Sequence, residues 1–248
     1  MTQEGRVAVF RPDDDRLEEA VELLDSLGTD PVPDPMLAIE PTGAMPRSDA
    51  DYVVLTSKTG VELAAERGWT PDNETIVAIG ERTARALREV GYEADLLPEE
   101  YSSEGLVRLL EERANGARVE VARSDHGSDV LLDGLHSAGA FVHETVLYEL
   151  TLPEDAGVST ERAADGELEA ALFTSSLTVE HFRMAARQRG IEQAAIDGLA
   201  DAVVGVIGEP TRETATNHGI DVDVVPEQAD FEELACAVVE EAAPSYRD

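Results

Sequence analysis

The segment AIGERTARALREVGYEADLLPEEYSSEGL at positions 78–106 returns later in the chain as VIGEPTRETATNHGIDVDVVPEQADFEEL at positions 206–234. The two stretches align without a gap, because every residue of the second lies 128 positions after its partner. Glycine, proline and threonine coincide at the places where elements begin or end. The matched pairs are Gly80 with Gly208, Thr83 with Thr211, Gly91 with Gly219, and Pro98 with Pro226. This repetition predicts an internal duplication.

Two shorter matches extend the repeat and suggest how the chain is divided. They pair LTSKTGVE (55–62) with FTSSLTVE (173–180), and VAVFR (7–11) with VEVAR (119–123). One copy then runs without interruption over 51–139. The other copy has its first two parts at 168–240 and its third part at 6–28. We therefore expect the N-terminal segment to complete the C-terminal domain, with the chain crossing twice between domains.

Short apolar runs alternate with amphipathic stretches along the chain. Asp13–Leu27 is typical of a helix, with Asp at its start, an apolar face, and Gly28 directly after it. Runs that are typical of buried strands are Arg6–Phe10, Tyr52–Leu55, Thr75–Ile79, Ala94–Leu97, Arg118–Ala122, Ala170–Phe173, Ala202–Ile207 and Val222–Val225. Strands that are mostly followed by helices predict an α/β fold with parallel sheets and helices on both faces.

Two strand-like segments, Pro31–Ile39 and Phe141–Leu152, have no obvious helix after them and are flanked by Pro or Gly. We interpret them as connectors rather than core strands, paired as a two-stranded hinge. The expected fold is α/β with two similar domains, each a parallel sheet flanked by helices, and a discontinuous domain 1. The expected boundaries are 1–30 and 154–248 for domain 1, 43–140 for domain 2, and 31–42 with 141–153 for the linker.

The charge of the chain is extreme. Lys and Arg total 19 against 53 Asp and Glu, for a net charge of −34, and Lys58 is the single lysine. Such a chain is not expected to bind nucleic acid or an anionic membrane through a broad electrostatic face. Self-repulsion of this size is largely screened at about 1 M salt, where the Debye length is only ~3 Å. Dispersed acid and scarce lysine favour a cytoplasmic protein of a salt-accumulating halophile over an ordinary acidic protein.

Other residue classes exclude several functions. One cysteine, Cys236, precludes internal disulfides, and the five histidines lack metal-binding spacing, so we expect no metal. The start of the chain lacks the charged and apolar regions of a signal peptide, and no apolar run reaches the ~18 residues of a membrane span. Phosphate-loop, dinucleotide and nucleophile-elbow motifs are missing from the sequence.

Hydroxyl and basic side chains follow most of the predicted strands. In parallel sheets, ligands bind at the carboxyl ends of the strands, where helix N-termini present N–H groups suited to carboxylates or phosphates. The candidate ligand contacts there are Arg11, Thr56, Ser57, Lys58, Thr83, Arg123, Thr174, Ser175, Ser176 and Thr211. Each has a plainer alternative, because Ser and Thr at a helix start are usually caps and the basic residues could simply be solvated.

Tyr148, in the segment VLYEL, is the candidate for a catalytic proton donor. It lies in the return connector, where its hydroxyl could donate a proton to a leaving group. On spacing alone, an aromatic residue that only packs at an interface fits equally well.

Six segments, taken in order, resemble the uroporphyrinogen-III synthase family. They are VLTSKTGVE, AIGERTARALREVG with LPEEYSSEGLVRLL, VARSDHGSDVLLDGL, ETVLYEL, LFTSSLTVEHF and VIGEPTRETATNHG, and they cover nearly all of 6–240. Tyr148 matches the family's tyrosine and Thr211 the threonine of its Gly-x-x-Thr. The other hydroxyl and Arg positions match its cleft less closely. Arg212 departs from the alanine that often follows that threonine, and its role stays open.

The resemblance implies a lyase without a cofactor that acts on hydroxymethylbilane, a linear tetrapyrrole with eight carboxylates. The family removes the terminal hydroxyl as water, forms a spiro intermediate through ring D, and closes the macrocycle with ring D inverted as uroporphyrinogen III. A transient handover of substrate from hydroxymethylbilane synthase fits the same resemblance. A monomer is expected from the sequence itself, because no exposed apolar helix face stands out in it. The alternatives are a two-lobed protein that binds a small anionic ligand without chemistry, and a degenerate member with a regulatory role.

Overall fold

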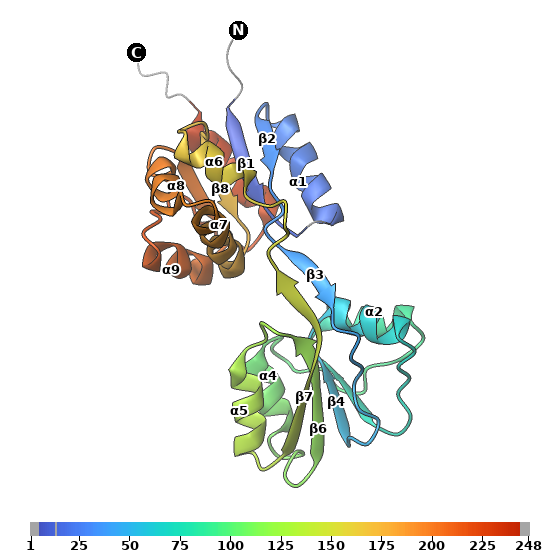
Figure 1. Ribbon diagram of the computed structural model, residues 1–248. Helices are drawn as coiled ribbons and strands as arrows, with labels where there is room; N and C mark the ends of the chain where they lie inside the picture. Colours follow the sequence, from blue (N-terminus) through green and yellow to red (C-terminus); the bar gives the residue numbers. More distant parts are fainter. Residues whose placement is uncertain (1–4, 13, 244–248) are drawn as a thin grey trace. The chain divides into compact units, whose positions relative to one another are not determined.

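The computed structural model describes residues 5–12 and 14–243, which form two compact units (Figure 1). Unit 1 combines the chain up to Ala38 with the chain from Thr151 onward, and unit 2 is the continuous stretch Ile39–Leu150. Among the described residues, no helix combines the length and the apolar character needed to cross a membrane.

Unit 2 is built on a five-stranded sheet in the order β3-β7-β6-β4-β5. Helices α2 and α3 pack on one face through Val61, Ala64 and Leu87, and α4 and α5 pack on the other through Leu106 and Leu135. The strands are β3 (Ala38–Pro41), β4 (Tyr52–Leu55), β5 (Thr75–Ala78), β6 (Arg118–Ser124) and β7 (Phe141–Thr151). The helices are α2 (Lys58–Glu66), α3 (Glu81–Glu89), α4 (Ser103–Leu110) and α5 (Asp129–Ser137).

Unit 1 has a four-stranded sheet in the order β2-β1-β8-β9. Its strands are β1 (Arg6–Phe10), β2 (Asp30–Pro33), β8 (Ala170–Phe173) and β9 (Val203–Val206). One face is covered by α1 (Asp15–Ser26) and α10 (Phe231–Ala242). The other is covered by α6 (Val158–Ala164), α7 (Ser176–Gln188), α8 (Glu192–Leu199) and α9 (Glu209–Asn217), around Phe10, Phe173 and Phe182. The predicted parallel α/β fold is confirmed.

The two sheets share the same pairing. In unit 1, β8 lies between β1 and β9, with Ala170 opposite Val7 and Val203. In unit 2, β4 lies between β6 and β5, with Tyr52 opposite Val119 and Thr75. The three residues of unit 1 are equivalent to the three of unit 2 in the sequence repeat. The repeat therefore extends to the strand register as well as to the amino-acid sequence.

Two predicted strands are wrong, and both copies show the same reason. Ala94–Leu97 and Val222–Val225 each make only a single bridge, at Leu96 and Val224. The carboxylate of Asp95 accepts a hydrogen bond from the Ile76 N–H at 2.7 Å, and that of Asp223 accepts one from the Val204 N–H at 2.8 Å. A side chain thus takes the donor that a strand ladder would use.

The interpretation of the two connectors is also wrong in part. Residues 30–33 form β2, a parallel edge strand paired with β1, and most of β7 is paired with β6. Pro31 and Pro33 are compatible with an edge strand because their missing N–H groups face away from the ladder. The division between the units falls within β3 and β7, which are hydrogen-bonded neighbours.

Candidate functional site

A cavity of about 400 Å³ lies in unit 2 at the carboxyl ends of β4 and β5, where α2 and α3 begin. Its lining residues are Thr56, Ser57, Lys58, Thr59, Ile79, Gly80, Glu81, Arg82, Thr83 and Tyr101. The first turn of α3 has Gly80 as its N-cap and no capping side chain. Its N–H groups therefore retain their capacity for an anionic ligand.

Four of the predicted contacts, Thr56, Ser57, Lys58 and Thr83, line this cavity. Ser57 caps α2, with its Oγ accepting from the Gly60 N–H at 2.9 Å. Lys58 is half-exposed and its Nζ lies 3.2 Å from the Glu62 carboxylate on the same helix. A pair that is open to solvent contributes little stability, so the ammonium group can exchange partners.

Tyr148 lies directly behind this cavity. Its side chain is 7 % exposed and packs with Leu147, Val61 and Ala122 in one of the two cores of unit 2. Its hydroxyl donates to the Oγ of Ser57 at 3.1 Å. The tyrosine that the sequence singled out is thus tied to the cavity by a serine that the sequence also singled out.

Tyr101 lines the same cavity and was not predicted. Its side chain is 62 % exposed, and its ring lies over Gly80, where an added Cβ would be 2.9 Å from the ring. The equivalent position of the second copy is Ala229, so the repeat gives no signal for an aromatic residue there. Its exposure at a pocket rim provides an aromatic face beside the N-terminus of α3.

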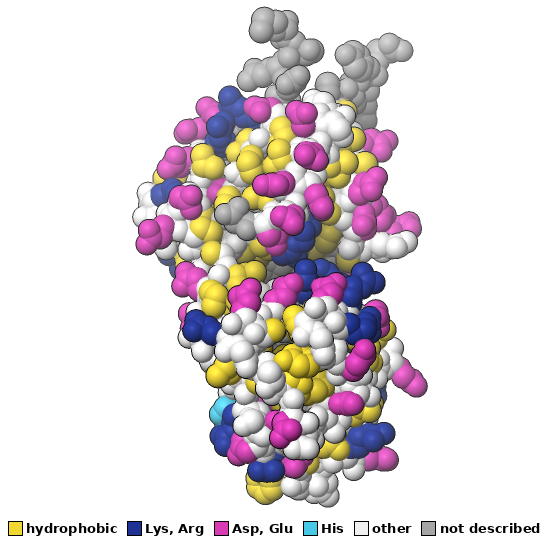
Figure 2. All heavy atoms as spheres, turned by 90° about the vertical axis from the view of Figure 1, so that its right-hand side faces the viewer, with side chains coloured by type: hydrophobic (Ala, Val, Ile, Leu, Met, Phe, Trp, Pro, Cys, Tyr) yellow, Lys and Arg dark blue, Asp and Glu magenta, His cyan; other side chains and the backbone are white. Residues whose placement is uncertain are grey.

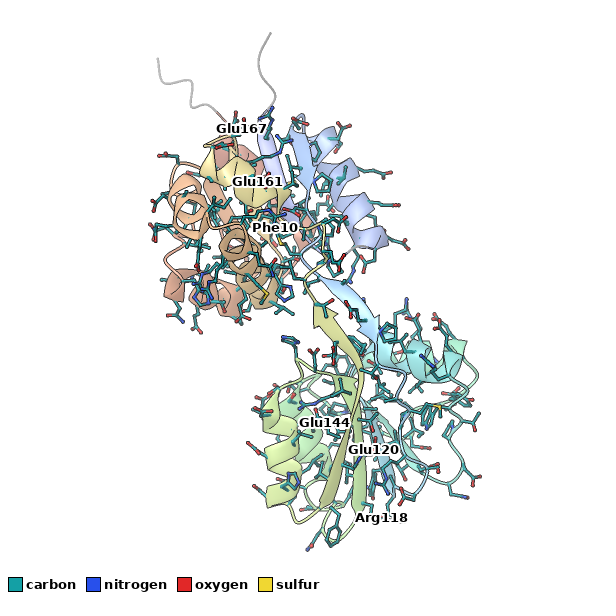
Figure 3. All side chains as sticks on the ribbon, in the orientation of Figure 1. Phe10, Arg118, Glu120, Glu144, Glu161 and Glu167 are labelled. Carbon is teal, nitrogen blue, oxygen red and sulfur yellow. The ribbon has the colours of Figure 1, made fainter. Side chains whose placement is uncertain are left out.

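Arg123 differs from the expectation that it faces the ligand. Only 4 % of it is exposed, and its guanidinium donates to the Glu144 carboxylate and to the Ser128 carbonyl, both at 2.6 Å. Glu144 lies on the neighbouring strand β7 (Figure 3). A register shift between β6 and β7 falls directly after Arg123. The guanidinium is therefore engaged within unit 2.

Arg11 follows β1 in unit 1 and lies over an aromatic ring. Its guanidinium carbon is 4.4 Å from the centre of the Phe231 ring, a cation–π distance. Partial burial, and secondarily the charge of Arg16, lower the pKa of Arg11 below its ordinary value. A partly desolvated cation of this kind interacts more strongly with an approaching carboxylate than a solvated one does. Asp13, the first residue of the helix predicted over 13–27, lies outside the described residues.

The hydroxyl groups of unit 1 mostly bond within the unit. Thr174 donates to the Phe10 carbonyl at 2.7 Å, and Ser176 donates to the Pro210 carbonyl at 3.1 Å. Ser175 caps α7 through the Thr178 N–H at 3.2 Å. Thr211 is buried in the first turn of α9, as Thr83 is in α3. The plainer expectation of helix caps thus describes Ser175 and Ser57, although a capping oxygen can still face a ligand.

Arg212, the departure from the family pattern, is exposed and pairs with Glu209 one turn earlier, with its Nε donating to the carboxylate at 2.8 Å. Within the described residues, no group of three or more His, Cys, Asp or Glu side chains is placed to hold a metal ion.

Comparisons with known proteins agree on one family. The model of the family described as "Uroporphyrinogen-III synthase HemD" matches residues 18–236. A "Putative uroporphyrinogen-III synthase" of Methanothermobacter thermautotrophicus is 34 % identical over 94 % of this chain and 96 % of its own length. The "Uroporphyrinogen-III synthase" of Synechococcus elongatus is 31 % identical over 64 % of each chain.

The fold has counterparts among solved structures. A crystal structure of a uroporphyrinogen III synthase mutant from Thermus thermophilus covers 96 % of this chain with 98 % of its own. The TM-score is 0.68 at 20 % sequence identity, a likeness that concerns the fold.

Proposed function

The chain belongs to the uroporphyrinogen-III synthase family, and from this membership we propose that it converts hydroxymethylbilane into uroporphyrinogen III. Water leaves from the terminal hydroxymethyl group, and the ring closes with ring D inverted. The observation that carries the proposal is the hydrogen bond from the Tyr148 hydroxyl to Ser57 at a cavity between two helix N-termini. It combines a proton donor with a site for carboxylates.

The reaction depends more on how the substrate is held than on reactive side chains. Without an enzyme, the substrate closes spontaneously to the uninverted isomer I, so catalysis must hold the chain ends in the arrangement that leads to isomer III. Ser57 contributes a hydroxyl contact with the substrate at the cavity of unit 2. The uncapped N–H groups of α3, the Thr56 hydroxyl and Lys58 support binding of carboxylates there. We assign Arg11, Thr83, Thr174, Ser175, Ser176 and Thr211 the same role, and Arg123 an indirect one.

We further propose the division given above into a discontinuous domain 1 and a continuous domain 2. The hinge is confined to those parts of 31–42 and 141–153 that lie outside the pairing of β2 with β1 and of β7 with β6, and it lets the two lobes fold a flexible substrate. We also propose that the enzyme is a cytoplasmic monomer that receives its substrate from hydroxymethylbilane synthase by transient handover.

The proposed solvent of the enzyme is a cytoplasm rich in salt. Acidic side chains are spread over the face shown in Figure 2 rather than gathered in one patch. With a net charge of −34, self-repulsion opposes folding in dilute buffer, and salt screens it. The substrate contacts proposed above act at short range, where screening matters least.

The test is a coupled assay in which hydroxymethylbilane is supplied, the products are oxidised, and the isomers are separated by chromatography. We expect isomer III, with a yield that rises as KCl increases from about 0.1 M to about 3 M. Isomer I alone at every salt concentration would contradict the synthase and favour a binding protein without chemistry. Full activity and stability in dilute buffer would contradict the halophilic proposal only.

A further inference from the structure

We propose that Ser57 is the group that touches the leaving hydroxyl of the substrate, and that Tyr148 stands behind it as the source of the proton. This inference deepens the proposed function and rests on it. It makes Ser57 the catalytic residue and Tyr148 a residue that acts through it.

The hydrogen bonds of the Ser57 oxygen leave its own proton available to a ligand. A serine hydroxyl has two acceptor sites and one donor. The Oγ of Ser57 accepts from the Gly60 N–H at 2.9 Å and from the Tyr148 hydroxyl at 3.1 Å. Both acceptor sites are then occupied, so the Ser57 O–H is left to donate to a third group.

Ser57 and Tyr148 differ in their access to the cavity. Ser57 lines the cavity at the ends of β4 and β5, whereas Tyr148 is 7 % exposed and is not among the lining residues. The Tyr148 ring is enclosed by apolar side chains of its own core, including Leu147 and Val61. A proton that moves from the phenol to this cavity therefore passes through the Ser57 oxygen.

The start of α2 is built so that Ser57 is held close to Leu147 and Tyr148. Gly60 lets Ser57 and Leu147 approach closely, because a Cβ at Gly60 would lie 3.0 Å from the Ser57 oxygen and 3.2 Å from Leu147. The N-terminus of α2 carries a partial positive charge, which stabilises negative charge that develops on a neighbouring oxygen. A phenolate at Tyr148 would be stabilised through the same serine.

The duplicated unit supplies an internal comparison. Ser175 of unit 1 is equivalent to Ser57 and caps α7 in the same way. The bridge that pairs Pro12 with Leu37 is equivalent to the pair Ser124–Tyr148, so Leu37 occupies the position of Tyr148. Among the described residues, Ser57 alone of these two serines accepts a hydrogen bond from a tyrosine hydroxyl, so a proton path at Ser57 can be told apart from helix capping.

The loss of water from the substrate takes two coupled proton transfers. The Ser57 proton passes to the hydroxyl oxygen of the substrate while the Tyr148 proton passes to the Ser57 oxygen. The carbon–oxygen bond breaks with its electron pair on oxygen, which leaves as water. The pyrrole nitrogen lone pair forms the new double bond of the cationic azafulvene, and Tyr148 is left as phenolate. The proton that the free pyrrole α-carbon loses at final closure returns along the same path.

The experiment is a double-mutant cycle on the full-length protein in high KCl. It measures kcat for isomer III with wild type, Ser57→Ala, Tyr148→Phe and the double variant. In a relay, each single change lowers kcat by about 10²–10³-fold, and the double variant loses no more than the larger single loss. Two independent groups would instead give losses that multiply, which would overturn the proposal. Spontaneous closure gives isomer I, so slow formation of isomer III remains measurable.

Two controls separate the proton path from folding. Ser57→Thr keeps the hydroxyl and the cap and is expected to restore most of kcat. Ser102→Ala removes a matched serine cap from α4, where Ser102 accepts from the Gly105 N–H at 3.0 Å. It is expected to lower thermal stability as Ser57→Ala does, with kcat unchanged. If Ser102→Ala lowers kcat as much as Ser57→Ala, the effect is structural and the proposal fails.

A proton inventory in mixtures of H₂O and D₂O gives an independent readout. We expect a curved dependence of kcat for wild type, because two protons move together, and a linear one for Ser57→Thr/Tyr148→Phe. A linear inventory in a wild type that makes isomer III would overturn the relay alone. A wild type that makes only isomer I would overturn the proposed function as well.

Discussion

At the scale of single residues, the contact between Gly80 and Tyr101 shapes the cavity of unit 2. Gly80 is in extended backbone, which any residue adopts, so its small size matters for space rather than for conformation. The Tyr101 ring occupies the volume that a side chain at position 80 would need. Its exposed ring is suited to lie against a pyrrole or its cationic azafulvene.

We predict that Gly80→Ala displaces this ring and costs about 1–3 kcal/mol of unfolding free energy, as overpacking does. The measurement is chemical denaturation in high KCl, together with KM for hydroxymethylbilane, which is expected to rise. Gly208→Ala is the matched control for stability, since Gly208 caps α9 equivalently and an added Cβ there meets only Pro210, at 4.0 Å. Equal losses in the two variants would contradict this account of Gly80.

Residues also mark the limit of what the sequence predicts. Tyr148, Ser57 and Lys58 could be selected because strand ends and the family pattern place them. The engagement of Arg123 by Glu144 could not, since it depends on the pairing of β6 with β7, a segment that the sequence suggested was a connector. Tyr101 lies in an irregular segment that carries no periodicity, and its copy in the repeat is alanine.

At the scale of elements, the ends of α7 and α8 are joined by charged side chains. The Glu192 carboxylate of α8 accepts from Arg183 at 2.6 Å and from Arg187 at 2.8 Å, both on α7. Hydrogen bonding to Arg187 is the largest effect on this carboxyl group. Desolvation opposes it, the hydrogen bond to Arg183 adds to it, and together they lower the pKa of Glu192 to about 2. The carboxylate is therefore better stabilised in the folded state than in the unfolded chain.

This shift predicts a pH dependence with a defined sign. A carboxyl group with a lowered folded-state pKa stabilises the fold above its ordinary pKa, and that stabilisation is lost as the pH falls from 4.5 towards about 2. The difference in unfolding free energy between wild type and Glu192→Gln should thus shrink over that range. Chemical denaturation at low and high salt measures it, with Glu213→Gln, an exposed carboxylate on α9, as control. A difference that is constant with pH would refute this role.

The elements were predictable in kind and partly in extent. Hydrophobic runs predicted the main strands of the two sheets except β2, β3 and β7, which lie in the two segments interpreted as connectors. The two prolines of β2 favoured a connector. Proline is tolerated in a strand where no neighbouring strand needs its N–H group, and the sequence does not show that β2 lies at the edge of the sheet. The strands predicted at 94–97 and 222–225 do not form, because a carboxylate accepts the hydrogen bond of the backbone N–H that a strand would use. The alternation of apolar and polar residues does not reveal such a replacement.

At the scale of the whole molecule, the two units differ in continuity. All strands and helices of unit 2 lie in one stretch of chain, and both of its cores are formed within that stretch. Unit 1 instead inserts β1, from the start of the chain, between β2 and β8. Its cores need Val7, Val9 and Phe10 beside residues of the second half.

We predict that residues 39–150 fold alone, with cooperative thermal unfolding by circular dichroism in about 3 M KCl, where charge repulsion is screened. The matched fragment, 151–243, is expected to lack a cooperative transition, because without β1 the inner edge of β8 and both adjoining cores are open to water. Independent folding of 151–243, or its absence for 39–150, would contradict this division of the chain.

The shared register of the two sheets has a consequence for the history of the gene. In unit 2 the chain passes from α4 to β6 through residues 111–117, whereas of the equivalent elements in unit 1, β1 is the first and α10 the last that the structure describes. The order of the described elements is therefore that of a circular permutation of a tandem pair. A chain that ran from α10 into β1, as unit 2 runs from α4 into β6, and that opened near position 150 would contain two uninterrupted copies, one after the other.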